Sequence, residues 1–244
     1  MKHPADHPAA HLDGLEPSYA ASLRAVAEPA GGTIVVAQLG QSLDGRIALP
    51  SGESRWINNQ AALDHLHRLR ASVDAVVVGI GTVRADDPQL TVRRCTGRSP
   101  ARVVIDRRGA CPHAAKVFAD DGAERALVTT AGVGAPPGVR RIVLAERGNA
   151  FEPFDVVAAL REQGWRRVLV EGGAGIVSAF IDAGVVDRLH VLVAPLLLGS
   201  GTTGLTLRTP PRLADALRPE TSVHVFADGD VLFDCNLRAR AEQV

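Results

Sequence analysis

The sequence predicts an α/β fold with a mostly parallel central sheet, helices on both faces and a C-terminal antiparallel hairpin. Two observations support this prediction. From residue 33 onwards, short β-branched segments alternate with amphipathic segments, which is the order expected of parallel strands joined by right-handed helical crossovers. Near the C-terminus, two strand-like segments instead flank Asp228-Gly229, a dipeptide typical of a tight hairpin turn.

The first half of the chain contains the clearest strand and helix signals. Residues 33–39 (TIVVAQL) predict a buried strand, and 42–49 (SLDGRIAL) predict a turn followed by a short strand. Residues 59–70 predict a helix with Ala62, Leu66 and Leu69 on one side. Residues 74–79 (DAVVVG) predict a strand that is buried on both faces. A short helix over 82–86 is expected to end before Pro88.

Later segments continue this alternation. Further strands are predicted at 102–105, 126–130, 141–144 and 167–171, and further helices at 154–162 and 175–183. The two strands of the hairpin are predicted at 222–227 and 230–237. The apolar segment 191–198 is expected to be a core strand, with a strand at a subunit interface as the alternative.

Residues 1–32 differ from the rest because they are rich in Ala, Pro and His. We expect a poorly ordered or strap-like segment there, followed by a single domain over 33–244. His3, His7 and His11 recur every four residues, as metal ligands on one helix face would. Pro4 and Pro8 lie among them and disfavour such a helix.

Composition excludes several classes of function. Lys+Arg and Asp+Glu are both 27, so no net field attracts nucleic acid or an anionic membrane. Lys2 and Lys116 are the only lysines, which argues against pyridoxal-phosphate chemistry. No apolar run approaches the roughly 18 residues of a membrane span. Since the three cysteines show no CxxC spacing, we expect a cytoplasmic protein with no disulfide and no metal.

Two glycine-rich turns are candidate anion sites. They are Gly79-Ile80-Gly81-Thr82 and Glu171-Gly172-Gly173-Ala174-Gly175, each between a predicted strand and a predicted helix. Such turns present backbone N–H groups at a helix N-terminus. The first departs from the GxGxxG dinucleotide pattern because Arg84 stands at the third glycine position. The alternative for either turn is a tight connection without a ligand.

Three arginines and a tryptophan add to the candidate site. Arg107 follows the acid that ends the strand 102–105, where an arginine can accept a cofactor 2′-phosphate and so favours NADPH; a solvated turn is the alternative. Arg70 and Arg93 are a candidate pair for a phosphate, although arginine is the usual cation of this chain and a lone arginine therefore indicates little. Trp56, in a polar loop, can pack on a flat ring or anchor the loop in the core, and considered alone it favours the anchor.

The chemistry that these features allow is limited. The sequence contains no GxSxG nucleophile elbow, no GxxxxGK phosphate loop and no HExxH motif. A nucleotide-type site with little acid-base machinery suits hydride transfer, in which the cofactor supplies the reactive group and the protein orients it.

Seven motifs occur in order between Gln38 and Gly201: SLDGRIAL, SGESRWI, a helix ending LRA, VVVGIGTVRADDPQLTVR, RVVID, VLVEGGAG and VDRLHVLVAPLLLGSG. Together they resemble the reductase domain of the bacterial riboflavin-biosynthesis deaminase/reductase, a relative of dihydrofolate reductase. The resemblance covers about two thirds of the chain. It implies a dihydrofolate-reductase-like fold, NADPH as cofactor, a homodimer, and reduction of the ribosyl group of 5-amino-6-(5-phosphoribosylamino)uracil to the ribityl chain.

The resemblance also implies roles for individual residues. By motif position, and for Arg107 by the charge argument above, the cofactor-binding residues are Gly40, Trp56, Gly81, Thr82, Asp86, Arg107, Gly172, Gly173, Ala174 and Gly175. The substrate-binding residues are Ser54, Arg70, Leu90, Arg93 and Glu171, with Glu171 and Asp86 as catalytic residues. In this interpretation Arg70 and Arg93 hold the 5′-phosphate, Leu90 packs on the pyrimidine, and Glu171 lies where the sugar opens.

Three departures from the family pattern bear on function. No HxE…PCxxC zinc-deaminase signature occurs, so a stand-alone reductase is expected. Gln38 stands where bacterial members usually carry a lysine near the substrate's sugar, which leaves the exact substrate open. Arg107 replaces a residue that is often a small hydroxyl residue in the family.

Several alternatives follow. The substrate is either the uracil or the 2,5-diamino-6-ribosylaminopyrimidinone 5′-phosphate, reduced before deamination. A reductase of dihydrofolate, a pterin or a specialised pyrimidine is a second enzymatic hypothesis, favoured if Arg70 and Arg93 bind no phosphate. A nucleotide-binding regulatory module is the non-enzymatic hypothesis, favoured by NADPH binding without turnover.

Overall fold

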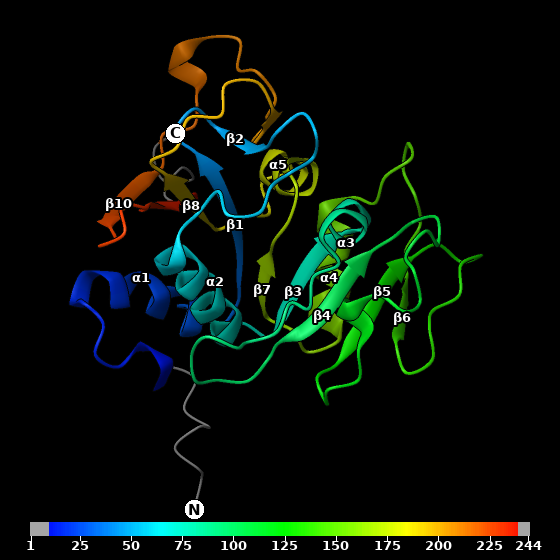
Figure 1. Cartoon of the computed structure of the whole chain (residues 1–244). Helices are drawn as coiled ribbons and strands as arrows, with labels where there is room; N and C mark the ends of the chain where they lie inside the picture. The colour runs from blue at the N-terminus through cyan, green and yellow to red at the C-terminus, as the bar shows by residue number, and fades with distance from the viewer. Residues whose placement is uncertain (1–9, 239–244) are drawn as a thin grey trace, which may run out of the picture.

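The strand-like segments form one nine-stranded sheet within residues 10–238, the part of the chain that this computed structural model describes (Figure 1). The strands are β1 (Ile34–Ser42), β3 (Ala75–Gly79), β4 (Ala101–Ile105), β5 (Arg125–Thr129), β6 (Arg140–Val143), β7 (Arg167–Val170), β8 (Arg188–Ala194), β10 (Glu220–Val225) and β11 (Val231–Asn236). A separate two-stranded ribbon pairs β2 (Arg46–Ala48) with β9 (Thr202–Thr203). Each expected strand is present, with its ends shifted by a few residues.

The strand order is β10-β11-β8-β1-β7-β3-β4-β5-β6. From β8 to β6 neighbouring strands are parallel, whereas β11 is antiparallel to both β8 and β10. The mostly parallel sheet with a C-terminal antiparallel hairpin is therefore confirmed. The expectation of a core strand over 191–198 is met only in its first half. Residues 191–194 lie in β8 within the sheet, whereas Leu196 and Leu197 beyond it are 39% and 70% exposed. β1 lies between two late strands, since Ile34 pairs with Arg167 and Gly40 with Leu192.

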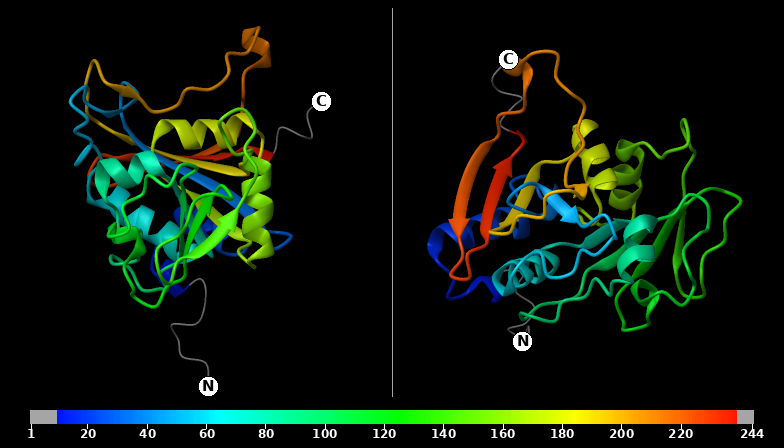
Figure 2. Two further views of the ribbon diagram at one scale, coloured as in Figure 1. Left: turned by 90° about the vertical axis from the view of Figure 1, so that its right-hand side faces the viewer. Right: turned by 45° about the horizontal axis from the view of Figure 1, so that its top comes forward.

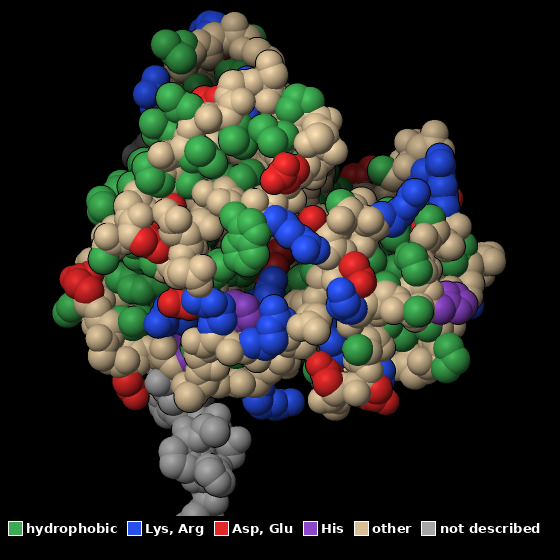
Figure 3. Space-filling view, viewed as in Figure 1, with side chains coloured by type: hydrophobic (Ala, Val, Ile, Leu, Met, Phe, Trp, Pro, Cys, Tyr) green, Lys and Arg blue, Asp and Glu red, His purple; other side chains and the backbone are tan. Residues whose placement is uncertain are grey.

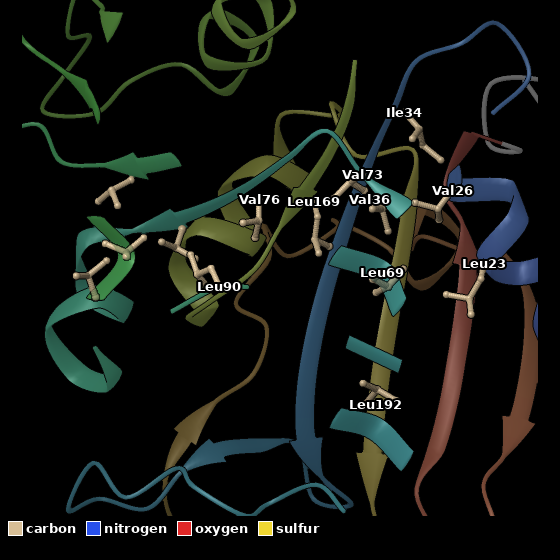
Figure 4. Packing of buried hydrophobic residues seen from close by; sticks show 14 of the residues in the cluster. Leu23, Val26, Ile34, Val36, Leu69, Val73, Val76, Leu90, Leu169 and Leu192 are labelled. Carbon is tan, nitrogen blue, oxygen red and sulfur yellow. The ribbon is translucent and has the colours of Figure 1, made fainter. Parts of the chain in front are cut away.

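Helices cover both faces of this sheet (Figure 2). One face packs against α1 (Pro17–Ala27), α2 (Gln60–Ser72) and α3 (Ile80–Asp86), and the other against α4 (Pro153–Glu162) and α5 (Ala174–Asp182). Figure 4 shows the first of these two cores, in which Leu23 and Val26 of α1 and Leu69 of α2 meet Val36 and Leu192 of the strands. In the described part of the chain, no helix combines the length and the hydropathy needed to cross a bilayer.

The segment before β1 corrects one expectation. Residues 10–27 are neither poorly ordered nor a strap, because they contain a short 3-10 turn and the helix α1, whose Leu23 and Val26 are fully buried. Pro17 occupies the first turn of α1, and the Glu16 carboxylate accepts the N–H groups of Ser18 and Tyr19 in that same turn. His11 is buried and contacts the Ser72 hydroxyl at 2.8 Å. His3 and His7 lie outside the described residues.

The turn of the C-terminal hairpin caps helix α2. Asp230 accepts the backbone N–H of Asn59 at 2.7 Å, and Asp228 accepts the N–H of Ala61 at 2.8 Å. Asn59 is the residue before the helix, but its own side chain makes no capping bond and donates to Asp230 instead. Two carboxylates from a distant part of the chain thus compensate the positive end of α2.

Candidate active site

A cavity of about 710 Å³ opens at the carboxyl ends of the central strands. Its wall consists of β1, α2, α3, the segment 47–58 and the turn after β7. This edge is the usual ligand site of open α/β sheets. The residues expected from the sequence that line the cavity are Gly40, Ser54, Trp56, Arg70, Gly81, Thr82, Asp86, Leu90, Glu171, Gly172 and Gly173.

The two glycine-rich turns meet in this cavity. The Gly173 N–H donates to the Thr82 hydroxyl at 3.0 Å, which joins the turn after β7 to α3. Gly172 has φ +121°, and a Cβ there would lie 2.5 Å from Thr82 Oγ1, so only glycine fits. Gly173 precedes α5 and offers no side-chain cap, which leaves the first N–H groups of α5 for another acceptor. Ala174 and Gly175 form the first turn of α5 and are not among the cavity-lining residues.

A buried ion pair lies at the wall of the cavity. Arg70 of α2 donates from Nε and Nη2 to the two carboxylate oxygens of Glu171 at 2.8 and 2.7 Å. The side chains are only 8% and 6% exposed. Arg70 Nη1 also donates to the Thr91 carbonyl at 3.3 Å. Two predicted site residues therefore lie in contact, and each neutralises much of the other's charge.

Arg93 lies at the rim, outside the residues that line the cavity. Its Nη1 donates to the Thr91 hydroxyl at 2.6 Å. Burial and the neighbouring charge of Arg70 lower the pKa of the Arg93 guanidinium, so the two cations are close enough to repel each other. Figure 3 shows Lys and Arg side chains gathered around the middle of this face, with a histidine among them. Leu90, with φ +55° and 2% exposure, lies in the cavity wall.

Trp56 corrects a second expectation. It has φ +71° and is 76% exposed, so the prediction of a core anchor is wrong. The indole instead borders the cavity, where an aromatic face is free to pack on a flat ring. Beside it, Ser54 Oγ lies 3.4 Å from Asp86 Oδ1, which brings a third pair of predicted residues together.

Arg107 lies away from this cavity, at the end of β4, where it pairs with Glu146 at 2.5 Å. The preceding Asp106 is buried and accepts the N–H groups of Arg108 and Cys111. Its carboxylate is thus occupied by its own loop. A smaller cavity of about 240 Å³ lies beside Asp106 and Cys111. Among residues 10–238, no cluster of side chains is suited to hold a metal ion.

Asn58 and Arg55 are two of the cavity residues that sequence reasoning missed. Asn58 donates to the Leu192 carbonyl at 3.3 Å, and its amide oxygen occupies the space that a side chain at Gly40 would need. Arg55 lines the cavity and forms no ion pair within the described chain. Both lie in the loop around Trp56, and nothing in the sequence predicts the path of that loop. Gln38, noted as a departure from the family, does line the cavity.

Comparisons with known proteins agree with this architecture. Residues 33–223 match the family model described as the RibD C-terminal domain. The riboflavin biosynthesis protein RibD of Mycobacterium tuberculosis is 36% identical over 181 residues, which cover 72% of this chain and 46% of that protein. A 2,5-diamino-6-ribosylamino-4(3H)-pyrimidinone 5′-phosphate reductase from Archaeoglobus fulgidus is 33% identical over 180 residues, which cover 68% of this chain and 81% of that protein.

The solved structure of Acinetobacter baumannii RibD superposes with a TM-score of 0.72 at 31% identity, covering 89% of this chain and 62% of that one. This chain spans about half the length of the curated RibD relatives that it matches.

Proposed function

The chain belongs to the RibD C-terminal domain family, and from that premise we propose that it is an NADPH-dependent reductase of a ribosylaminopyrimidine 5′-phosphate. One observation supports this function above the others. A single cavity takes its wall from both glycine-rich turns, which suit a dinucleotide, and from the Arg70–Glu171 pair, which suits a polar sugar phosphate.

The residues on one side of the cavity fit a dinucleotide. Gly172 and Gly173 leave the space and the backbone N–H groups that a pyrophosphate needs, and the exposed Trp56 offers a face for a flat ring. NADPH would supply a hydride when bound. Thr82, Gly81 and the more distant Arg107 complete the proposed cofactor contacts, together with Gly40, Asp86, Ala174 and Gly175.

The opposite side fits the substrate. We assign the 5′-phosphate to Arg93 and Arg70, which donate to the hydroxyl and the carbonyl of the same residue, Thr91, and the pyrimidine to Leu90. Glu171, whose orientation is fixed by Arg70, accepts hydrogen bonds from the sugar hydroxyls. The Ser54 hydroxyl donates to Asp86 Oδ1 at 3.4 Å, so it lies between the proposed substrate side and the proposed cofactor side. The hydride goes to the anomeric carbon of the ring-opened imine, and the imine nitrogen takes a proton from water.

The proposed pyrimidine is the uracil, and the 2,5-diamino form is the alternative. The archaeal relative, which is matched over 81% of its length, supports this alternative. The test is NADPH oxidation by the purified protein with both compounds side by side. Turnover of one compound identifies the substrate. Binding of NADPH without turnover of either would contradict the proposed reaction and direct the search to pterins.

Arginine substitution separates substrate from cofactor. We expect Arg93→Ala to raise KM for the phosphorylated pyrimidine at least tenfold and to leave KM for NADPH unchanged, because only the substrate loses a charge-assisted contact. Arg98→Ala removes a nearby exposed arginine and serves as the matched control. Equal kinetics for the two variants would remove Arg93 from the substrate site.

We also propose that the protein acts as a homodimer in the cytoplasm. Val223 and Val225 of the edge strand β10 are 52% and 74% exposed, and Phe233 of β11, opposite Val223, is 37% exposed. A second copy would cover this apolar strip. Light scattering after size exclusion is expected to give twice the chain mass for the natural protein and the chain mass for Val225→Glu. A monomeric natural protein would refute the dimer.

A further inference from the structure

The segment 88–100 has unusual backbone bonding. It lies between α3 and β4 and contains no regular element, and in the described chain none of its residues takes part in a backbone–backbone hydrogen bond. Side chains hold it in place instead. Ser99 accepts the N–H of Val92, and Arg70 donates to the carbonyl of Thr91. Leu90 anchors the first part of the segment in the core at 2% exposure, and Arg102 Nη1 donates to the Gln89 carbonyl at 3.5 Å. From Thr91 onwards, the order of the segment depends on a few side-chain contacts.

A further contact of this segment comes from His67. This residue lies on α2, is 5% exposed, and its Nδ1 accepts the backbone N–H of Arg93 at 2.9 Å. A ring nitrogen that accepts a hydrogen bond carries no proton, so the imidazole is neutral with its proton on Nε2. Burial lowers the pKa of His67 to about 4, with a further contribution from the charges of Arg70, Arg93 and Arg94. The charge of Asp64 raises the pKa by a smaller amount. The acceptor therefore persists at neutral pH.

The arginines around His67 differ in what they bind. Arg70 is paired with Glu171, and Arg94 with Asp64 at 2.5 Å. Arg93 has no ion-pair partner within residues 10–238, and its guanidinium donates to a neutral hydroxyl, Thr91. Of these three cations, Arg93 is the one whose charge remains available for an anion. Its backbone position depends on His67.

We propose that His67 is a positioning residue for anion binding: its Nδ1 holds the backbone of Arg93 so that the guanidinium is already in place when a sugar phosphate arrives. This proposal rests on the proposed function and adds to it a residue outside the cavity wall. Without His67, each binding event must order the 88–100 segment, and that entropy is subtracted from the affinity. Loss of one such hydrogen bond corresponds to roughly five- to tenfold weaker binding.

Ribose 5-phosphate is a suitable probe, with ribose as its uncharged counterpart. Isothermal titration calorimetry of the full chain measures Kd for both compounds. We expect His67→Ala to raise Kd for ribose 5-phosphate roughly five- to tenfold and to leave the weak binding of ribose unchanged. In turnover, KM for the pyrimidine phosphate rises similarly, whereas kcat and KM for NADPH stay the same.

Two variants distinguish positioning from loss of folding. Asn can offer its amide oxygen in place of Nδ1, so His67→Asn is expected to restore binding to within about twofold of the natural protein. His11→Ala removes another buried histidine with one hydrogen bond, to Ser72 at 2.8 Å, and makes no contact with Arg93. It controls for destabilisation and is expected to leave Kd unchanged.

The outcomes separate this inference from the proposed function. Equal binding of ribose 5-phosphate by His67→Ala and the natural protein, or equal weakening in His11→Ala, would overturn it. If the natural protein reduces neither pyrimidine but loses ribose 5-phosphate binding only with His67→Ala, the positioning role stands and the proposed reaction fails. If the natural protein reduces a pyrimidine phosphate and His67→Ala leaves its KM unchanged, the reaction stands and the positioning role is wrong.

Discussion

Replacing Arg70 by methionine is expected to destabilise the fold by about 3 kcal/mol, because Glu171 then keeps a buried charge without a partner. Breaking a buried ion pair typically costs about 3–5 kcal/mol. The lower end applies here because both side chains, although only 8% and 6% exposed, line a cavity that water can enter. In the double variant Arg70→Met/Glu171→Gln neither charge remains, so the total loss is expected to be about 1–2 kcal/mol.

Urea unfolding of the natural protein, both single variants and the double variant gives the coupling energy between the two residues. We expect at least about 2 kcal/mol of favourable coupling. The exposed pair Arg212–Asp215, three residues apart, is the control, and its coupling should not be measurable. A coupling for Arg70 and Glu171 within about 0.5 kcal/mol of zero would refute the reasoning, because it would mean that water replaces each partner without cost.

Three further predictions concern the glycine turn, the core and acid stability. Gly172→Ala should lower the free energy of unfolding in urea by about 2–4 kcal/mol, because of strain at φ +121° and the clash with Thr82. Adding Thr82→Ala should recover part of this loss. A Gly172→Ala variant as stable as the natural protein would contradict the prediction. Leu69→Ala, at a fully buried position, should cost about 2–5 kcal/mol, and a loss below about 1 kcal/mol would show that the core closes around the gap. Burial, and then the nearby charge of His190, lower the pKa of His65 well below its usual value. The unfolded chain therefore binds a proton that the folded chain does not bind. The contribution of His65 to the free energy of unfolding should be fully present above about pH 6.5 and decrease as the pH falls below it. Urea midpoints that stay constant from pH 7 to 5 would refute this.

The local elements were predictable because their signals are local. The run DAVVVG contains β3 whole, and Pro153 marks the start of α4. The helix α1 was missed although Pro17 and the spacing of Leu23 and Val26 indicate it. The Ala- and Pro-rich composition of residues 1–32 favoured a poorly ordered segment instead. The apolar periodicity of α1 stabilises a helix only when the rest of the core is present to bury its apolar face.

The candidate site was predictable in its residues and less so in its contacts. Arg70 and Glu171 are 101 positions apart, and no spacing rule predicts that they pair. Arg107 was assigned because it follows an acid at the end of a strand, whereas its partner Glu146 follows another strand, β6. Exposure of Trp56 depends on a left-handed backbone angle in an irregular loop, where residue type alone does not determine conformation.

The central position of β1 has a consequence for synthesis of the protein. Gln38 and Gly40 leave the ribosome early, yet their strand is completed only by β7 and β8, and α2 receives its caps from Asp228 and Asp230. Contacts of such long sequence separation form slowly. The cavity therefore forms only when nearly the whole chain has been translated. Until then the apolar strand β1 is unpaired and prone to aggregation. We expect a chain that stops before β11 to lack the formed site, although every residue that lines the cavity precedes β11.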